Sequence, residues 1–170
     1  MHLPTPLAAD GFVLRPQCGA DYDFLERLYM SVRKTELAPL DWPDVAKRAF
    51  LADQHRLQHA HYSQHYRDAE FLILEHLSEP VGRLVVYCNE RDLRIVDIAL
   101  LPECRNRGVG TALLQAAMNE AAAAGKTVSI HVEKFNPAQR LYRRLDFHEI
   151  SESGPYWLME WRREERPPAA

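Results

Sequence analysis

Cysteine is scarce in this sequence, and its spacing excludes two common uses of the residue. The 170 residues include 3 cysteines, which are Cys18, Cys88 and Cys104. An odd number with no C-x-x-C pair indicates neither a disulfide framework nor a zinc site. Reduced thiols of this kind are typical of the cytoplasm, and we predict a cytoplasmic protein.

Long hydrophobic runs are also missing. No apolar stretch reaches the ~20 residues that a membrane-spanning helix needs. The N-terminus has no basic segment followed by an apolar one, which a secretory signal would require. We therefore expect neither membrane insertion nor secretion.

Charge of one sign is not in excess. The 21 Lys and Arg residues are balanced by 24 Asp and Glu, for a formal net charge of -3. A nucleic-acid backbone requires a basic face, which this balance does not supply, so we expect no nucleic-acid partner. The length and the 46% hydrophobic content suit one globular domain. We predict a single domain over 1–170, with its core at about 12–161 and a flexible charged tail at 162–170.

Hydrophobic periodicity predicts an alternation of strands and helices. Strands are expected at 12–16, 71–74, 81–87, 94–101, 127–132 and 156–161, and helices at 21–33, 44–67, 109–124 and 136–145. The segment 44–67 forms one long helix or two shorter ones, with a shared side that includes Val45, Ala49, Phe50, Leu57, His61 and Tyr62. The apolar run at 94–101 predicts burial on both faces of that strand, and a crossover helix to a parallel neighbour follows it.

The turn from Arg105 to Gly110 is the strongest functional signal. It joins a buried strand to a helix, where unpaired N–H groups and the positive end of the helix dipole favour a phosphate. Its glycines allow a tight turn and close approach of a ligand, while its arginines add charged donors. The alternative is a glycine turn that only begins a helix. A dinucleotide fingerprint fails at Leu113, and a P-loop match fails at Glu120.

Two motifs resemble those of a known family. The segment Arg105-x-x-Gly108-x-Gly110, followed by Thr111-Ala112-Leu113-Leu114, is similar to the acyl-CoA-binding motif of the GNAT superfamily of N-acetyltransferases. The block from Asn136 to Phe147 resembles the C-terminal motif of that family. Asp146 stands where the family usually has glycine, and aspartate tolerates left-handed backbone angles better than most residues.

The resemblance implies a fold and a cofactor. The fold class is α/β (α+β), with a mixed sheet of about six or seven strands, splayed between strands 4 and 5 and flanked by about four helices. The implied cofactor is acetyl-CoA (CoA), with strand backbone along the pantetheine. The implied cofactor-binding residues are Ile98, Ala99, Leu100, Arg105, Asn106, Arg107, Gly108, Val109, Gly110, Thr111, Asn136, Ala138 and Tyr142.

Acetyl transfer to an amine needs an acid for the leaving thiolate and a base for the ammonium. Tyr142 matches the position where the family commonly places the acid, and a core tyrosine is the alternative. His131 is the first candidate base by its strand position, with a core hydrogen bond as the alternative. Asp97 is the second candidate, although structural pairing of this carboxylate is favoured.

The long second helix carries His55, His59, His61 and His65, and we predict no metal there. The two i, i+4 pairs point in different directions, and no carboxylate or cysteine completes a ligand pattern. A solvated or substrate-facing helix is favoured instead. In this family the first helices commonly wall the acceptor site, which gives as candidate substrate contacts Trp42, Gln58, His61, Tyr62 and Tyr66, with ordinary helix packing as the alternative. Asp97, on the predicted strand at 94–101, is a further candidate contact.

The resulting hypothesis is an acetyl-CoA-dependent N-acetyltransferase. It would acetylate a primary amine of a small molecule or peptide by direct attack in a ternary complex. The alternative is a non-catalytic acyl-CoA-binding sensor or partner module with the same fold. The late strand at 156–161 could pair across a homodimer or complete the core.

Overall fold

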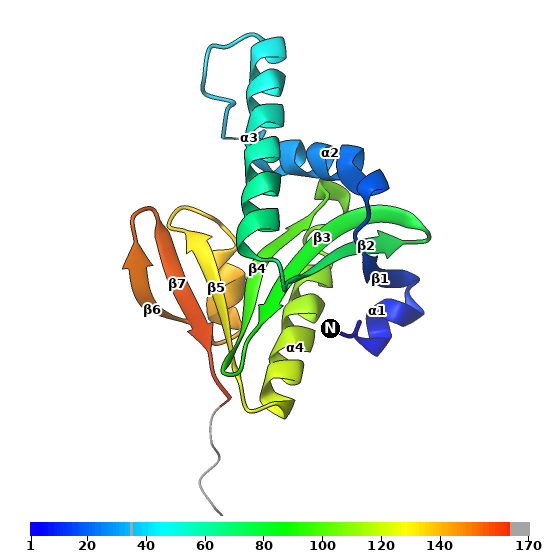
Figure 1. The fold of residues 1–170 in the computed structure, drawn as a ribbon, viewed down its shortest axis with the longest axis vertical. Coiled ribbons are helices and arrows are strands. Elements are labelled where there is room, and N and C mark those ends of the chain that lie inside the picture. Colours follow the sequence, from blue (N-terminus) through cyan, green and yellow to red (C-terminus); the bar gives the residue numbers. More distant parts are fainter. Residues whose placement is uncertain (35, 164–170) are drawn as a thin grey trace, which may run out of the picture.

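The protein forms one central sheet with helices on both faces (Figure 1). The computed structural model describes residues 1–34 and 36–163, so the tail predicted at 162–170 lies outside the described residues from 164 onward. The helices are α1 (Thr5–Ala9), α2 (Tyr22–Arg33), α3 (Asp44–His65), α4 (Val109–Ala123) and α5 (Gln139–Arg144), with short 3-10 turns η1 (Gly19–Asp21) and η2 (Pro102–Cys104). The strands are β1 (Phe12–Pro16), β2 (Glu70–His76), β3 (Glu79–Cys88), β4 (Asp92–Leu100), β5 (Thr127–Glu133), β6 (His148–Ser153) and β7 (Tyr156–Trp161). None of the helices in the described ranges is both long enough and apolar enough to cross a membrane.

The sheet is mixed and has the strand order β1-β2-β3-β4-β5-β7-β6. The pair β4–β5 is parallel and is connected through α4, whereas the other neighbouring strands are antiparallel. A parallel pair requires a crossover of this length, since a tight turn cannot bring the chain back in the same direction. The predicted fold class is therefore confirmed.

The sheet parts between β4 and β5. Their pairing extends only from Asp92 with Thr127 to Ile95 with Ile130, although both strands continue beyond it. The register between β3 and β4 shifts next to the same point, where Val85 faces Asp97 and Val86 faces Ile95. Such a bulge bends its strand and increases the local twist. The opening predicted between the fourth and fifth strands is thus present.

Different helices cover the two faces of the sheet. On one face, α4 contributes Leu114 and Ala117 to a core with the apolar side chains of β5. On the other, α2 packs Leu25 and Leu28 against Ile73 of β2. Each buried leucine contributes roughly 1.5–3 kcal/mol by leaving water. The two layers therefore pack against both faces of β4 beside the opening.

Three details of the predicted elements were wrong. Residues at 44–67 form one helix, but the side predicted to be apolar is mostly exposed: Val45, Phe50 and Leu57 are 72%, 40% and 53% exposed. The buried residues of α3 are Leu51 and His55, because the N-terminal half of the helix extends beyond the sheet (Figure 1).

Residues 94–101 are not buried throughout as predicted. Leu93 and Ile95 are buried in β4, but the residues from 96 to 101 are only half-buried because β5 no longer covers that edge. The helix predicted to begin at Asn136 begins at Gln139 instead. The preceding residues make i→i+3 bonds, including Gln139 N–H to the Asn136 carbonyl at 3.2 Å, which form a tighter turn.

His55 is the least expected residue of the core. The sequence favoured a solvated or substrate-facing position, but its side chain is 0% exposed and packs against Tyr22 and Tyr29 of α2. Neither ring nitrogen has a hydrogen-bond partner within the described chain. Burial, with the nearby charges of Arg83 and His59, lowers the pKa of His55 to about 4.

This environment predicts a loss of stability in acid. The folded pKa lies below the unfolded value of about 6.5, so the unfolded chain binds the proton first as the pH falls between these values. Protonation of His55 in the unfolded chain should therefore lower the free energy of unfolding by up to about 3 kcal/mol as the pH falls from 6.5 to 4. Denaturant unfolding at pH 7 and pH 4.5 measures this loss. It should shrink in His55→Leu and persist in His148→Gln, an exposed control; an unchanged loss in His55→Leu would contradict the assignment.

Candidate active site

The turn before α4 presents a row of free backbone donors. Gly108 adopts a left-handed conformation (φ 82) and caps the helix, and Asn106 is also left-handed (φ 58). In the described part of the chain, the first backbone N–H after Arg105 with a recorded acceptor is that of Ala112, which bonds to the Gly108 carbonyl at 2.9 Å. The N–H groups of 106–111 are therefore available to an anion at the positive end of the helix dipole.

Arg105 links this turn to β4. Its Nε donates to the Leu100 carbonyl at 2.8 Å, which fixes the side chain between the turn and the strand. Its Nη2 is buried and has no partner among residues 1–34 and 36–163. A buried guanidinium nitrogen without an acceptor is costly. An anionic group bound beside the turn would satisfy it.

The second half of β4 has an open edge. From Asp97 to Leu100 the strand pairs with β3 on one side, but β5 has already turned away on the other. The residues predicted to present their backbone, Ile98, Ala99 and Leu100, lie in this stretch. An edge of this kind can pair with an extended ligand as an added strand would. The open edge leads from the Arg105–Gly110 turn toward the gap between β4 and β5.

Tyr142 lies on the α4 side of that gap. It is in α5, its side chain is 5% exposed, and its ring packs against Phe147 at 6.0 Å. Within the described residues its hydroxyl makes no recorded hydrogen bond. Burial and then the charge of Asp97 raise the pKa of Tyr142, so the phenol stays protonated well above neutral pH.

The C-terminal motif positions Tyr142 through two local features. The Asn136 Oδ1 accepts from the Ala138 N–H at 2.9 Å and holds the turn before α5. Asp146 has a φ of 62, as expected at the position where the resembled family has glycine. Both features fix the short helix against the core.

The other face of the gap carries the polar residues of β5. His131 is exposed, and the side chains of Ser129 and Glu133 lie on the same face, as strand alternation predicts. Burial and then Arg94 lower the pKa of His131, which keeps its imidazole neutral at pH 7. Glu133 bonds to Arg33 of α2 at 2.9 Å and so bridges the two sides of the opening.

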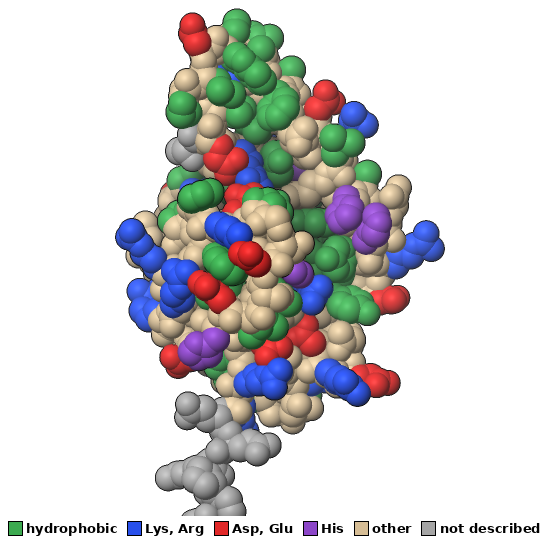
Figure 2. All heavy atoms as spheres, turned by 90° about the vertical axis from the view of Figure 1, so that its left-hand side faces the viewer, with side chains coloured by type: hydrophobic (Ala, Val, Ile, Leu, Met, Phe, Trp, Pro, Cys, Tyr) green, Lys and Arg blue, Asp and Glu red, His purple; other side chains and the backbone are tan. Residues whose placement is uncertain are grey.

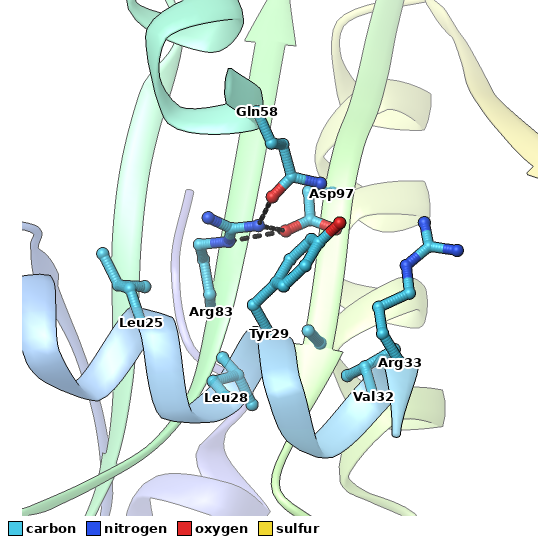
Figure 3. A pocket seen from close by; sticks show the side chains of 9 residues that line it. Leu25, Leu28, Tyr29, Val32, Arg33, Gln58, Arg83 and Asp97 are labelled. Carbon is cyan, nitrogen blue, oxygen red and sulfur yellow. Dashed lines mark hydrogen bonds and ion pairs between the residues drawn. The ribbon is translucent and has the colours of Figure 1, made fainter. Parts of the chain in front are cut away.

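A small pocket of about 50 Å³ lies between α2, α3 and the second half of β4. Its lining consists of Leu25, Leu28, Tyr29, Val32, Arg33, Gln58, Arg83, Asp97 and Ala99. Figure 3 shows Gln58, Arg83 and Asp97 meeting at its centre, with the Tyr29 ring rising from α2 toward them. One side of the pocket is lined by apolar side chains of α2, and the other by the polar side chains of Gln58, Arg83 and Asp97.

Asp97 is paired, as the sequence favoured. Arg83, which is 5% exposed, bonds to Asp97 Oδ2 and to Gln58 Oε1, the latter at 2.9 Å. No bond to Asp97 Oδ1 is recorded in the described chain, which leaves this oxygen available at the pocket. Replacing one partner of such a buried pair leaves an uncompensated charge and is strongly destabilising.

The predicted substrate contacts separate into two groups. Gln58 and Asp97 line the pocket, and Tyr62 lies beside it, with the Arg83 guanidinium 5.6 Å from its ring. Trp42, His61 and Tyr66 do not line it. Trp42 packs edge-on against Phe50, in the protruding end of the molecule where hydrophobic side chains gather at the top of Figure 2.

Sequence reasoning missed three polar residues of the pocket, Tyr29, Arg33 and Arg83. Tyr29 and Arg33 come to the pocket only through the packing of α2, and no local pattern indicates this. Arg83 could have been found, because it is the single charge in the apolar run from Val81 to Val86, and a buried charge requires a partner.

The histidines of α3 gather no ligand set. Stacked rings join His61 to His65 at 4.2 Å, while His55 faces α2. In the described ranges, no group of three or more His, Cys, Asp or Glu residues is placed to hold a metal ion.

A mixed sheet that parts between β4 and β5 beside a glycine-rich turn is the arrangement that the resemblance to the GNAT superfamily implies. Comparison with known proteins agrees with this resemblance. Residues 67–149 match the family described as Acetyltransferase (GNAT) domain. The sequence matches no curated protein.

Solved structures show the same fold at low identity. PaiA N-acetyltransferase from Thermoplasma acidophilum, in complex with coenzyme A, has a TM-score of 0.66 at 17% identity, over 89% of this chain and 99% of that one. An acetyltransferase from Thermus thermophilus has a TM-score of 0.60 at 20% identity, over 95% and 99%. A GNAT family acetyltransferase from Elizabethkingia anophelis, with acetyl-CoA bound, has a TM-score of 0.58 at 17% identity, over 90% and 99%. These solved structures show that the chain has the GNAT fold, and the family model matches residues 67–149 of it.

Proposed function

We propose that the protein is an N-acetyltransferase that transfers the acetyl group of acetyl-CoA to a primary amine of a small molecule or peptide. The observation that carries this proposal is the combination of three features. The free N–H groups of 106–111 are followed by the open edge of β4, and Tyr142 lies in the core cluster against which Ile98 of that edge packs.

The residues present fit the coenzyme. The N–H groups of the turn and the unpaired Nη2 of Arg105 suit its pyrophosphate, with Arg107, Val109 and Thr111 contributing from the turn and first helical residues. The open edge at Ile98 to Leu100 suits the pantetheine amides, and Asn136 and Ala138, in the turn before α5, are proposed as further contacts. Relatives with this fold were solved with coenzyme A and with acetyl-CoA. When bound, acetyl-CoA supplies an activated thioester.

The chain contributes the acid and the base from opposite sides of the gap. The Tyr142 hydroxyl holds a proton at neutral pH and donates it to the departing sulfur. The neutral His131 imidazole accepts the amine proton, directly or through a water molecule. The Arg83–Asp97 pair and the apolar side of α2 orient the amine beside the opening. Direct attack then needs no covalent enzyme intermediate.

Thiol release from acetyl-CoA in the presence of an amine panel tests this function. The panel contains alkyl monoamines, polyamines, lysine derivatives and short peptides with free N-termini. We expect saturable release that depends on at least one amine and yields the acetylated product by mass spectrometry. Tight coenzyme binding without release for any member of the panel would instead support the non-catalytic module.

A further inference from the structure

A second polar groove lies outside the site described above. It has a volume of about 430 Å³ and occupies the paired ends of β4 and β5, away from the gap. Its lining consists of Asn89, Arg91, Asp92, Arg94, Thr127, Ser129, Ile150, Leu158, Glu160 and Arg162. Figure 2 views the β6–β7 side of the molecule and shows charged side chains of both signs across it. The proposed acetyl transfer uses none of these residues.

Arg94 is held in place at the centre of this groove. Its Nε donates to Ser129 Oγ at 3.3 Å, and this serine is 2% exposed. Ser129 in turn donates to Asp92 Oδ2 at 2.5 Å, while Thr127 Oγ1 donates to Asp92 Oδ1 at 2.9 Å. Both carboxylate oxygens of Asp92 therefore accept hydrogen bonds from hydroxyl groups. The distance from Asp92 Oδ2 to Arg94 Nε is 4.0 Å.

The fork of Arg94 remains free as a result. In the part of the chain that the structure describes, no acceptor is recorded for its terminal nitrogens. The side chain is 31% exposed, so the stem is held while the end faces the groove. The two terminal nitrogens of a planar guanidinium form a pair of N–H donors that matches the geometry of a carboxylate or phosphate.

The rest of the groove adds positive charge and an apolar floor. Three arginines face two carboxylates, which gives a net charge of +1. The Arg162 Nε bonds to Glu160, whereas the Arg91 side chain has no recorded acceptor among residues 1–34 and 36–163. The turn that carries Arg91 is fixed, since its N–H donates to Asn89 Oδ1 at 2.8 Å. Ile150 and Leu158 supply the apolar part of the lining.

We propose that this groove binds a small oxyanion, a carboxylate or a phosphate with a short apolar body, through the Arg94 fork with Arg91 as a second contact. The proposal does not rest on acetyl transfer, although the groove adjoins the proposed base, since Arg94 also lowers the pKa of His131. The Arg94 fork fits a carboxylate and a phosphate alike, so the experiment below is designed to distinguish these two ligands.

Titration of the full chain, followed by amide and arginine Nε resonances, tests the proposal. Inorganic phosphate and butyrate are added in separate experiments. Phosphate also suits the turn at 106–111, so the residues whose signals move distinguish the two places. We expect saturable shifts at Arg94 and Ser129 with a millimolar Kd for at least one probe, and the tighter probe identifies the oxyanion.

Variants give the matched comparison. Arg94→Gln should weaken binding in the groove about tenfold or more, and Arg94→Lys should fall between, because it keeps the charge without the fork. Arg56→Gln, at an exposed position on α3, should bind like the wild type. Arg91→Gln provides a surface variant if Arg94→Gln does not fold, and it should also weaken binding. Non-saturable shifts at Arg94 for both probes, shifts confined to 106–111, or equal binding by these groove variants and the wild type would overturn the proposal.

Discussion

Gly110→Glu is expected to reduce acetyl-CoA affinity by a factor of about a thousand or more while the domain stays folded. The substitution places a carboxylate where the turn offers its N–H groups, so attraction for phosphate becomes repulsion. The backbone tolerates the change, since a Cβ at Gly110 would have its nearest contacts at 3.9 Å, with Leu100 and Leu141. Isothermal titration calorimetry measures the affinity, and thermal unfolding checks the fold.

Gly110→Ala is the matched control for this variant. It adds the same Cβ without the charge, so it should fold normally and lose much less affinity than Gly110→Glu. Equal losses in the two variants would indicate a steric effect alone. Unchanged affinity in Gly110→Glu would exclude the turn as the phosphate site.

Tyr142→Phe is expected to lower kcat about a hundredfold with little change in acetyl-CoA affinity. The ring packs in the core beside Phe147, and phenylalanine preserves this packing, so the loss should come from the missing hydroxyl proton.

Because burial raises the pKa of Tyr142, the wild-type rate should also show no decline from ionisation of this phenol near pH 9 to 10. Steady-state thiol release across pH measures both effects.

Tyr156→Phe provides the comparison for Tyr142→Phe. This tyrosine is 40% exposed on β7, and removing its hydroxyl should leave kcat unchanged. If Tyr142→Phe retained the wild-type kcat, another group would have to protonate the departing thiolate.

The elements that carry a local signal could be predicted from the sequence. The apolar runs of β3, β4 and β5 and the crossover through α4 predict the parallel pair, because each run has both length and composition typical of buried strands. The Arg105–Gly110 turn is equally local, since its glycine positions and helix start are adjacent in the chain. The left-handed Asp146 follows from the motif around it.

Other features depend on tertiary context. The strand β6 was missed because every residue from His148 to Ser153 is exposed, so it lacks the alternation that marks a half-buried strand. The buried side of α3 was wrong because only part of this helix lies over the sheet, and periodicity does not say which part. The pocket residues Tyr29 and Arg33 meet Asp97 only through the packing of α2 on β4.

Backbone amide resonances recorded with and without acetyl-CoA test the central claim most directly. If acetyl-CoA binds along the turn and the open strand edge, the amides of 106–111 and of 97–100 should shift together and saturate with one Kd. The amides of β1 and β2, at the far edge of the sheet, serve as the internal reference and should remain unchanged. Saturable binding that leaves both 106–111 and 97–100 unperturbed would contradict this account of the site.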